Sequence, residues 1–255
     1  DYGYSSCPDF GRALEEYACF ESILQKFIPE IIYQTDKKPA GPDTIYTHDA
    51  VKMTSRGAIL MRMGKPLRSQ EPIMAKDLLT GYGINILGEI EPPGVMEGGD
   101  IVWIGNKTAA LGLGFRTNPE GVEQFRSLTK SFIDTFIVVP LPYAEGPDAC
   151  LHLMSLISML DHDLALVYSR YMPVFFRNLL IDRGIRLIEV AEEEYATLGG
   201  NVLAIAPRKC VALEGNPLTA EKMKAANVQL FTFPGQEISL KGTGGPTCLT
   251  CPIQR

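Results

Sequence analysis

Two cysteines near the C-terminal end of the chain are the first candidates for chemistry. Cys248 and Cys251 lie three positions apart in KGTGGPTCLTCPIQR, behind a glycine-rich run. A structural zinc site usually needs four ligands in two close pairs, and the sequence has no second close pair of cysteines or histidines. A thioredoxin-like redox pair starts a helix, whereas here a proline follows. The pattern therefore favours one nucleophile, which the glycines let approach a ligand closely.

A cysteine nucleophile needs a base, and the sequence has three histidines: His48, His152 and His162. His152 stands between two leucines, where a histidine satisfied inside a core is the more common finding. Glu97 and Asp100 flank paired glycines in MEGGDIV, and such acids are usually turn formers. Asp43 and Asp49 lie among β-forming residues in PDTIYTHDA. Spacing alone leaves both a site and a structural use open for these side chains.

Composition narrows the class of protein. The 255 residues carry a net charge of −6, with no cluster of lysine and arginine, so a nucleic-acid partner is not expected. No apolar run approaches the roughly 18 residues of a membrane helix, and we expect no membrane partner. The six cysteines are scattered rather than arranged as a dense disulfide framework, which favours reduced thiols and a cytoplasmic protein.

The chain has a weak internal repeat of about fifty residues. Matching alanines in four apolar strand patterns lie 52, 55 and 47 residues apart: Ala58, Ala110, Ala165 and Ala212. Each pattern follows another apolar piece and precedes a helical pattern and a β-branched run. Each unit is therefore predicted to be a ββαβ block. Such blocks cannot bury their faces alone, so the repeat predicts an α/β fold in which they pack around an axis as a propeller.

A fifth block is predicted from the two ends of the chain. Its helix would be 12–27, and its strands 30–35, 237–241 and 246–253. This block would close the propeller, so residues 1–255 are expected to form a single catalytic domain. A strand before residue 12 is missing from the pattern, and we therefore expect a truncated chain.

Several motifs together resemble one known family. PDTIYTHDAV, RMGKPLR, EGGDIVWIG, GLGFRTNPEG, LHL and GGPTCLT occur in the order and at the spacing of the guanidino-group-modifying enzymes. This superfamily includes arginine deiminases, amidinotransferases and dimethylarginine dimethylaminohydrolases, and the likeness runs over residues 42–252. It implies a five-bladed α/β propeller of ββαβ units, the pentein fold, in agreement with the repeat. It also implies a small guanidino substrate, and no cofactor or metal.

The resemblance implies a catalytic set. Cys248 would be the nucleophile, His152 the general acid and base, and Glu97 the carboxylate that orients His152. The thiolate would attack the guanidinium carbon and leave an S-alkylthiouronium on the enzyme, which water activated by His152 would hydrolyse. A delocalised guanidinium is a poor electrophile, so a thiolate suits this attack. Cys251 would be a neighbour of undecided role.

The resemblance also implies residues that bind the substrate. Asp49 would bind the guanidinium, with His48 beside it. Arg68 and Arg116 would grip the α-carboxylate, and Asp43 the α-amine. Alternatively, Arg68 and Arg116 would each be a solvated surface charge, which is the more common case for a lone arginine in a loop.

Departures from the family patterns bear on the substrate. Met154 stands where deiminases and amidinotransferases carry aspartate, which favours a methylated guanidine such as dimethylarginine, hydrolysed to citrulline and dimethylamine. His48 stands where dimethylarginine dimethylaminohydrolases usually have glutamate, which argues against that substrate. Arginine deiminase activity, amidinotransferase activity and a non-catalytic binding role therefore stay open. A homodimer is a separate alternative that also stays open.

Overall fold

The computed structural model describes residues 2–34, 41–147, 149 and 151–253. They fall into two compact units. Unit 1 comprises Gly3–Ile32 and Ser155–Thr247, and unit 2 comprises Tyr2, Tyr33–Met154 and the segment from Cys248 onward. No helix in these described ranges is long and apolar enough to cross a membrane. The single domain expected over 1–255 stays a prediction.

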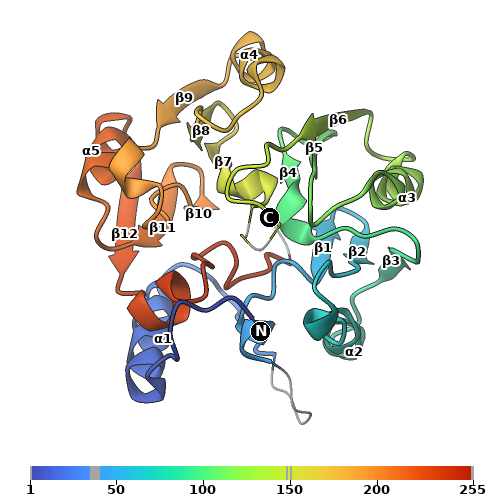
Figure 1. Cartoon of the computed structure of the whole chain (residues 1–255), viewed down its shortest axis with the longest axis horizontal. Coiled ribbons are helices and arrows are strands. Elements are labelled where there is room, and N and C mark those ends of the chain that lie inside the picture. Colours follow the sequence, from blue (N-terminus) through green and yellow to red (C-terminus); the bar gives the residue numbers. More distant parts are fainter. Residues whose placement is uncertain (1, 35–40, 148, 150, 254–255) are drawn as a thin grey trace. The chain divides into compact units, whose positions relative to one another are not determined.

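Unit 2 contains two ββαβ blocks, drawn in blue to green in Figure 1. The elements of the first are β1 (Val51–Thr54), β2 (Gly57–Leu60), α2 (Glu71–Gly81) and β3 (Ile86–Glu89). Those of the second are β4 (Ile101–Trp103), β5 (Thr108–Leu113), α3 (Pro119–Thr129) and β6 (Thr135–Pro140). In each block the middle strand pairs antiparallel with the strand before it and parallel with the strand after the helix.

Unit 1 contains two further blocks with the same pairing. The first consists of β7 (Ile157–Asp161), β8 (Leu164–Val167), α4 (Val174–Asp182) and β9 (Arg186–Glu189). The second consists of β10 (Leu203–Ala206), β11 (Lys209–Leu213), α5 (Pro217–Ala225) and β12 (Gln229–Phe233). The four matched alanines all lie in middle strands, and all are buried. The ββαβ repeat predicted from the sequence is confirmed.

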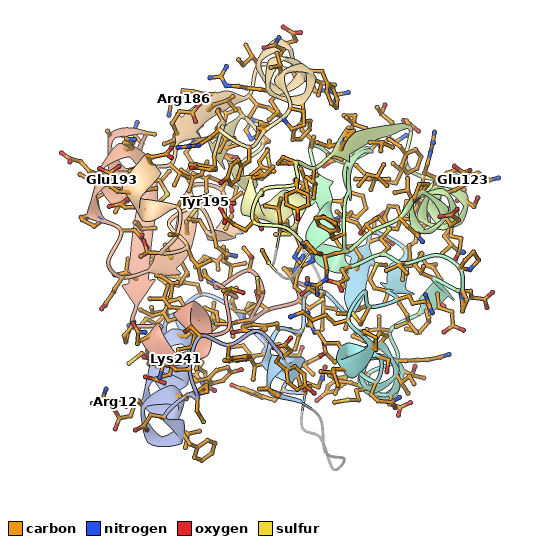
Figure 2. The ribbon with its side chains drawn as sticks, in the orientation of Figure 1. Arg12, Glu123, Arg186, Glu193, Tyr195 and Lys241 are labelled. Carbon is orange, nitrogen blue, oxygen red and sulfur yellow. The ribbon has the colours of Figure 1, made fainter. Side chains whose placement is uncertain are left out.

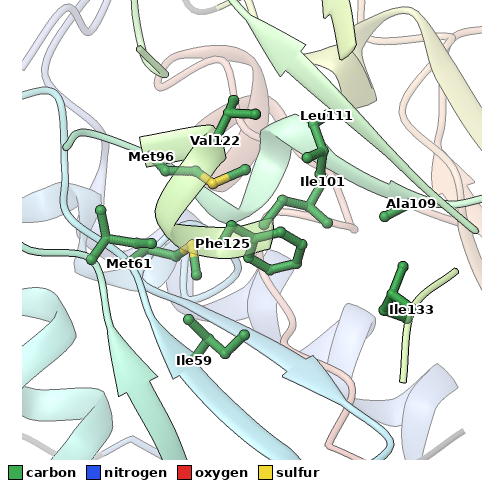
Figure 3. Close-up of a cluster of buried hydrophobic side chains, with 10 residues drawn as sticks. Ile59, Met61, Met96, Ile101, Ala109, Leu111, Val122, Phe125 and Ile133 are labelled. Atoms are coloured by element: carbon green, nitrogen blue, oxygen red, sulfur yellow. The ribbon is translucent and has the colours of Figure 1, made fainter. Parts of the chain in front are cut away.

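The core of unit 2 shows why these segments form their elements. Asn118 caps α3 by accepting a hydrogen bond from the Gly121 N–H at 2.8 Å, and Pro119 follows in the first turn. Val122 and Phe125 then lie on one face, because residues three apart on a helix are neighbours. Both are buried among side chains of β2, β4 and β5 (Figure 3). Burial of a phenylalanine of this kind stabilises the fold by about 1.5–3 kcal/mol.

The predicted fifth block is wrong in its strands. Within the described residues, 30–34 and 246–253 form no strand, and 237–241 overlaps a π-helix, η6 (Gln236–Leu240), instead. The predicted helix is present as α1 (Phe10–Gln25), which packs on η6 within unit 1. Figure 2 labels Arg12 on α1 and Lys241, the residue that follows η6.

The reason for the helix at 236–240 is a buried carboxylate. Glu16 Oε2 on α1 accepts hydrogen bonds from the backbone N–H groups of Glu237 at 2.8 Å and Ile238 at 3.0 Å. N–H groups at the first turn of a helix have no partner within the helix, so a carboxylate there favours helix over strand. The alternating pattern of EISLK could not reveal this partner, which lies 221 residues away.

Candidate functional site

Three of the predicted site residues meet in unit 2. Asp49 precedes β1, Glu97 precedes the short 3-10 helix η3 (Gly98–Asp100), and His152 precedes the 3-10 helix η4 (Leu153–Ser155). All three side chains are buried. His152 Nε2 lies 2.7 Å from Glu97 Oε2, and His152 Nδ1 lies 3.9 Å from Asp49 Oδ1. Residues that precede the first strands of three successive ββαβ blocks, β1, β4 and β7, therefore build one cluster.

The cluster suits proton transfer beside a bound cation. The bond to the Glu97 carboxylate makes Nε2 of His152 the donor and fixes the ring orientation. The other ring nitrogen, Nδ1, then faces the Asp49 carboxylate. A guanidinium bound by Asp49 would lie next to Nδ1, within reach of a proton donor and acceptor.

The paired glycines of the sequence allow this close approach. A Cβ on Gly99 would lie 2.6 Å from His152 Nδ1 and 3.0 Å from Asp49 Oδ1. A Cβ on Gly98 would lie 2.1 Å from the backbone oxygen of His48. Neither position has room for a side chain. The glycines are therefore more than turn formers, since they make space for the histidine and for the chain at Asp49.

Arg116 also contacts the carboxylate of Glu97. Arg116 Nε lies 3.0 Å from Oε1, and Arg116 Nη2 lies 2.8 Å from Oε2. The backbone N–H of Gly64 donates to Oε1 at 2.8 Å. Burial opposes ionisation of Glu97, but the hydrogen bond from His152 and the charge of Arg116 outweigh it and hold its pKa below the ordinary value. Glu97 is therefore a fixed negative charge behind the histidine.

Three buried aspartates near the site differ in the direction in which their pKa is shifted. Burial opposes ionisation of Asp49, but the charges of His152 and Arg68 outweigh it and lower its pKa well below the usual range. Burial dominates at Asp43 and Asp100, and it raises the pKa of both. Asp49 is thus the aspartate here that is best suited to bind a cationic group.

Arg68 is buried, and protein groups already occupy most of its donors. Its Nε and Nη2 donate to the two oxygens of Glu71, each at 2.8 Å, and its Nη1 donates to Asp49 Oδ2 at 2.9 Å. Nη2 also donates to the Tyr46 carbonyl at 3.2 Å. The predicted two-pronged grip on a substrate carboxylate would require some of these bonds to break, so for Arg68 it stays a prediction.

Neither predicted arginine is a solvated surface charge, because Arg68 and Arg116 are 3% and 5% exposed. Asp43, the predicted amine ligand, is buried at 3.8 Å from both Lys65 Nζ and Arg68 Nε. Glu71 was missed by the sequence analysis. The signal was its position three residues after Arg68, at the start of a helix, where an opposite charge can pair.

Asp100 connects two segments that carry site residues. Its Oδ1 accepts a hydrogen bond from the Leu153 N–H at 2.9 Å, next to His152. Its Oδ2 accepts one from the Thr117 hydroxyl at 2.6 Å, next to Arg116. Asp100 therefore holds both neighbours in place without presenting a free carboxylate.

The segment of the predicted nucleophile lies beside the chain at Asp49. The carbonyl oxygen of Cys248 accepts a hydrogen bond from the His48 N–H at 3.2 Å, and the Cys248 residue is partly exposed. Cys251 packs instead against the buried cluster around Val51 and Leu60. The two cysteines therefore have different surroundings. Cys150, in the predicted CLHLMS motif, lies outside the described residues.

The predicted ligand His48 has protein partners at both ring nitrogens. Nδ1 lies 3.1 Å from the Thr250 carbonyl oxygen, and Nε2 lies 3.0 Å from Lys52 Nζ. Lys52, a buried lysine that the sequence analysis missed, also donates to the Gly98 carbonyl at 3.1 Å. Its only sequence signal is a charge inside an apolar strand. Substrate binding by His48 stays a prediction.

The spacing of Asp49, Glu97 and His152 would also allow a metal ion. Their contacts fit that use poorly, because Glu97 Oε2 is already bonded by His152 and paired with Arg116. The site as built fits an organic cation better than a metal.

Curated proteins with similar sequences include arginine deiminases. The arginine deiminase of Rhodococcus jostii is 29% identical over 194 residues, which span 63% of this chain and 46% of that protein. The uncharacterized protein YkgA of Bacillus subtilis is 27% identical over 214 residues, spanning 84% of this chain and 71% of that one. The chain thus covers about half the length of the arginine deiminase that it matches.

Solved structures with the same fold include a dimethylarginine dimethylaminohydrolase of Pseudomonas aeruginosa in complex with citrulline. It matches with a TM-score of 0.80 and 26% identity, over 96% of this chain and 91% of that one. This likeness confirms the predicted fold class, an α/β fold of ββαβ units of the pentein kind, and the guanidino-modifying superfamily. The family model for arginine deiminase matches residues 38–183 and 171–255. The chain therefore belongs to the arginine deiminase family.

Proposed function

We propose that this chain hydrolyses the guanidino group of an arginine-like amino acid through a covalent cysteine intermediate. The observation that carries the proposal is the buried set of Asp49, His152 and Glu97. The Asp49 carboxylate can bind a cation, and the His152 imidazole lies next to it. The Glu97 carboxylate holds the opposite side of that imidazole. The membership of the arginine deiminase family supports the same chemistry.

Each residue has a defined part in the proposed reaction. Asp49 binds the guanidinium in a buried site, where a charge-assisted hydrogen bond fixes its orientation. Cys248 attacks the central carbon as a thiolate, and His152 protonates the amine that leaves. His152 then takes a proton from water, which attacks the thiouronium carbon. The C–S bond breaks, Cys248 leaves as a thiolate, and a ureido product is released. Glu97, held by Arg116 and Gly64, stabilises the imidazolium in both steps.

Within this class we propose a methylated arginine as the substrate. Met154 supplies an apolar side chain two residues after His152, where N-methyl groups could be accommodated. The fold match to a dimethylarginine dimethylaminohydrolase supports this choice. Unmethylated arginine is the second candidate, and it is favoured by the curated arginine deiminases among the relatives.

The direct test is turnover of dimethylarginine, arginine and agmatine, with the ureido product measured by colour and the released amine by NMR. We expect dimethylamine from dimethylarginine, and agmatine to be the poorest substrate because it lacks the α-carboxylate. Ammonia from arginine alone would assign a deiminase, and transfer to an added acceptor amine an amidinotransferase. No product from any guanidine would contradict the proposal.

Labelling of the thiol tests the nucleophile separately. We expect 2-chloroacetamidine, an electrophilic mimic of a guanidinium, to add once per chain at Cys248. Cys248→Ser should keep the fold and retain less than about 1% of turnover, because an alcohol is a far weaker nucleophile than a thiolate at neutral pH. Absence of labelling at Cys248 in the folded wild type would favour a binding relative without catalysis.

Substitution of Arg116 tests whether its guanidinium binds the substrate or only holds Glu97. If it binds the substrate carboxylate, Arg116→Ala should lower kcat/KM for amino-acid substrates by about 2 kcal/mol and leave agmatine nearly unchanged. If it serves only to hold Glu97, both substrates should lose activity equally. We expect the first pattern superimposed on a smaller loss common to both.

A further inference from the structure

Outside the predicted catalytic set, a second group of contacts holds the segment that carries Cys248. We propose that His48 and Lys52 form a clip that positions this cysteine loop, defined as residues 248–251, rather than binding the substrate. The inference deepens the proposed function, because it assigns a positioning role for the same nucleophile. It rests on five contacts, all within unit 2.

His48 holds the cysteine loop at two places. Its backbone N–H donates to the Cys248 carbonyl at 3.2 Å, and its ring Nδ1 lies 3.1 Å from the Thr250 carbonyl oxygen. These two carbonyls flank Leu249, which is buried. One histidine therefore fixes the backbone on the nucleophile and two residues beyond it.

The partners define the tautomer of His48. A carbonyl oxygen can only accept, so Nδ1 carries the proton in the bond to Thr250. In the neutral ring Nε2 is then an acceptor, which matches the Lys52 ammonium at 3.0 Å. Both bonds are satisfied at once by a neutral histidine protonated on Nδ1. This arrangement leaves both ring nitrogens engaged inside the protein.

Lys52 connects the clip to the loop of Glu97. Its Nζ donates to the Gly98 carbonyl at 3.1 Å as well as to His48. Lys52 is 5% exposed and lies in β1, so the strand holds its backbone in place. The chain of contacts runs from the cysteine loop through His48 and Lys52 to the residue that follows Glu97. It therefore couples the position of the nucleophile to the position of the carboxylate behind His152.

The far end of the cysteine loop has its own anchor. Cys251 packs against the buried cluster that contains Val51 and Leu60, and its Sγ lies 3.9 Å from the Val51 carbonyl oxygen. The clip and this anchor together leave few ways for the loop to shift. The KM of the proposed reaction should depend on Asp49 and Arg116, whereas kcat should depend on the clip.

Two substitutions of His48 separate its two ring bonds. In His48→Asn the side-chain amide nitrogen takes the place of Nδ1 and can still donate to Thr250, but it does not reach Lys52. In His48→Gln the amide oxygen takes the place of Nε2 and can still accept from Lys52, but the donor to Thr250 is lost. Lys52→Met keeps the apolar stem and removes the ammonium. The matched controls are His162→Asn, His162→Gln and Lys107→Met, at exposed positions.

The first measurement is hydrogen–deuterium exchange of the peptide that contains 248–251, with intact mass and melting temperature to confirm folding. We expect at least fivefold faster exchange in His48→Gln and Lys52→Met, a smaller change in His48→Asn, and none in the controls. This measurement needs no turnover. It therefore judges the clip even if the proposed function fails and no guanidine is hydrolysed.

The second measurement is the rate of turnover on the best guanidine found. We expect kcat to fall about tenfold or more in His48→Gln and Lys52→Met with KM changed less than threefold, and His48→Asn to retain most of kcat. Unchanged exchange of the loop in both His48→Gln and Lys52→Met would overturn the proposal. A large rise in KM with unchanged kcat in both His48 variants would also overturn it, because that pattern belongs to a substrate ligand.

Discussion

Two buried glutamates, one in each unit, put the same side chain to different uses. In unit 2, Glu97 is paired with the guanidinium of Arg116 and bonded to the imidazole of His152. In unit 1, Glu194 accepts backbone N–H bonds from Leu218 at 2.8 Å and Thr219 at 2.7 Å, at the start of α5. Both have a lowered pKa. A carboxylate bonded to a helix terminus stabilises the fold, whereas one bonded to an imidazole can take part in proton transfer.

The difference follows from what each partner can do. Burial opposes ionisation of Glu194, but the bonds from Thr219 and Leu218 outweigh it, and these N–H groups do not exchange protons during a reaction. The Glu97 partner His152 is an imidazole, which can donate and accept protons, and its other nitrogen lies 3.9 Å from Asp49 Oδ1. Burial and a perturbed pKa alone therefore do not identify a catalytic carboxylate, and its partner decides.

The largest expected effect comes from replacing one histidine of each unit by alanine and comparing the two variants. His152→Ala should lower kcat/KM by roughly 10²–10⁴-fold, because both protonation of the leaving amine and activation of water would be lost. His162 is exposed and bonded to Asp161 at 2.8 Å, so His162→Ala should leave turnover unchanged. Steady-state kinetics on the best guanidine measures both. Equal activity of the two variants would remove His152 from the mechanism.

The next largest effect is expected from replacing Glu97 and Glu194 by glutamine and comparing the two variants. Glu97→Gln should lower kcat/KM on the order of 10²-fold, because the imidazolium of His152 would lose its carboxylate. Glu194→Gln should keep kcat/KM and lower the free energy of unfolding by about 1.5–3 kcal/mol, the range for hydrogen bonds to a charged group. Kinetics and urea unfolding of both variants give the comparison. A loss of turnover in Glu194→Gln without loss of stability would contradict it.

The pH dependence of stability should expose the structural glutamate. The pKa of Glu194 lies below its ordinary value of 4.5 in the folded state, so the folded state is favoured above that pH. This stabilisation is lost as the pH falls through the lowered folded pKa. The difference in unfolding free energy between wild type and Glu194→Gln should therefore be constant above about pH 5 and shrink on acidification. A difference that grows below pH 4 would show the opposite sign.

The smallest expected effect concerns the second cysteine. Cys251→Ala removes one sulfur from the packing against Val51 and Leu60, and it should lower the free energy of unfolding by about 1 kcal/mol or less. Turnover and labelling of Cys248 should be nearly unchanged, since Cys251 packs as an apolar side chain. The melting temperature and the site of chloroacetamidine addition measure this. Addition at Cys251 in place of Cys248 would reverse the assignment of the two thiols.

The sequence by itself predicted the repeated part of the fold. Apolar strand patterns around Ala58, Ala110, Ala165 and Ala212 mark middle strands, because a strand paired on both sides and covered by helices is apolar throughout. The same local rule failed at 237–241. There the partner of the backbone N–H groups is Glu16, and a periodic pattern contains no information on a distant carboxylate.

The sequence also determined which residue types could do chemistry: a cysteine behind glycines, three histidines, and acids before strands. Only the tertiary structure decided how they pair. It joined His152 to Glu97, occupied the donors of Arg68 with Glu71 and Asp49, and engaged His48 with Lys52 and Thr250. The physical reason is that a buried charge takes its partner from whatever the fold brings within about 3 Å, and sequence spacing does not specify that partner.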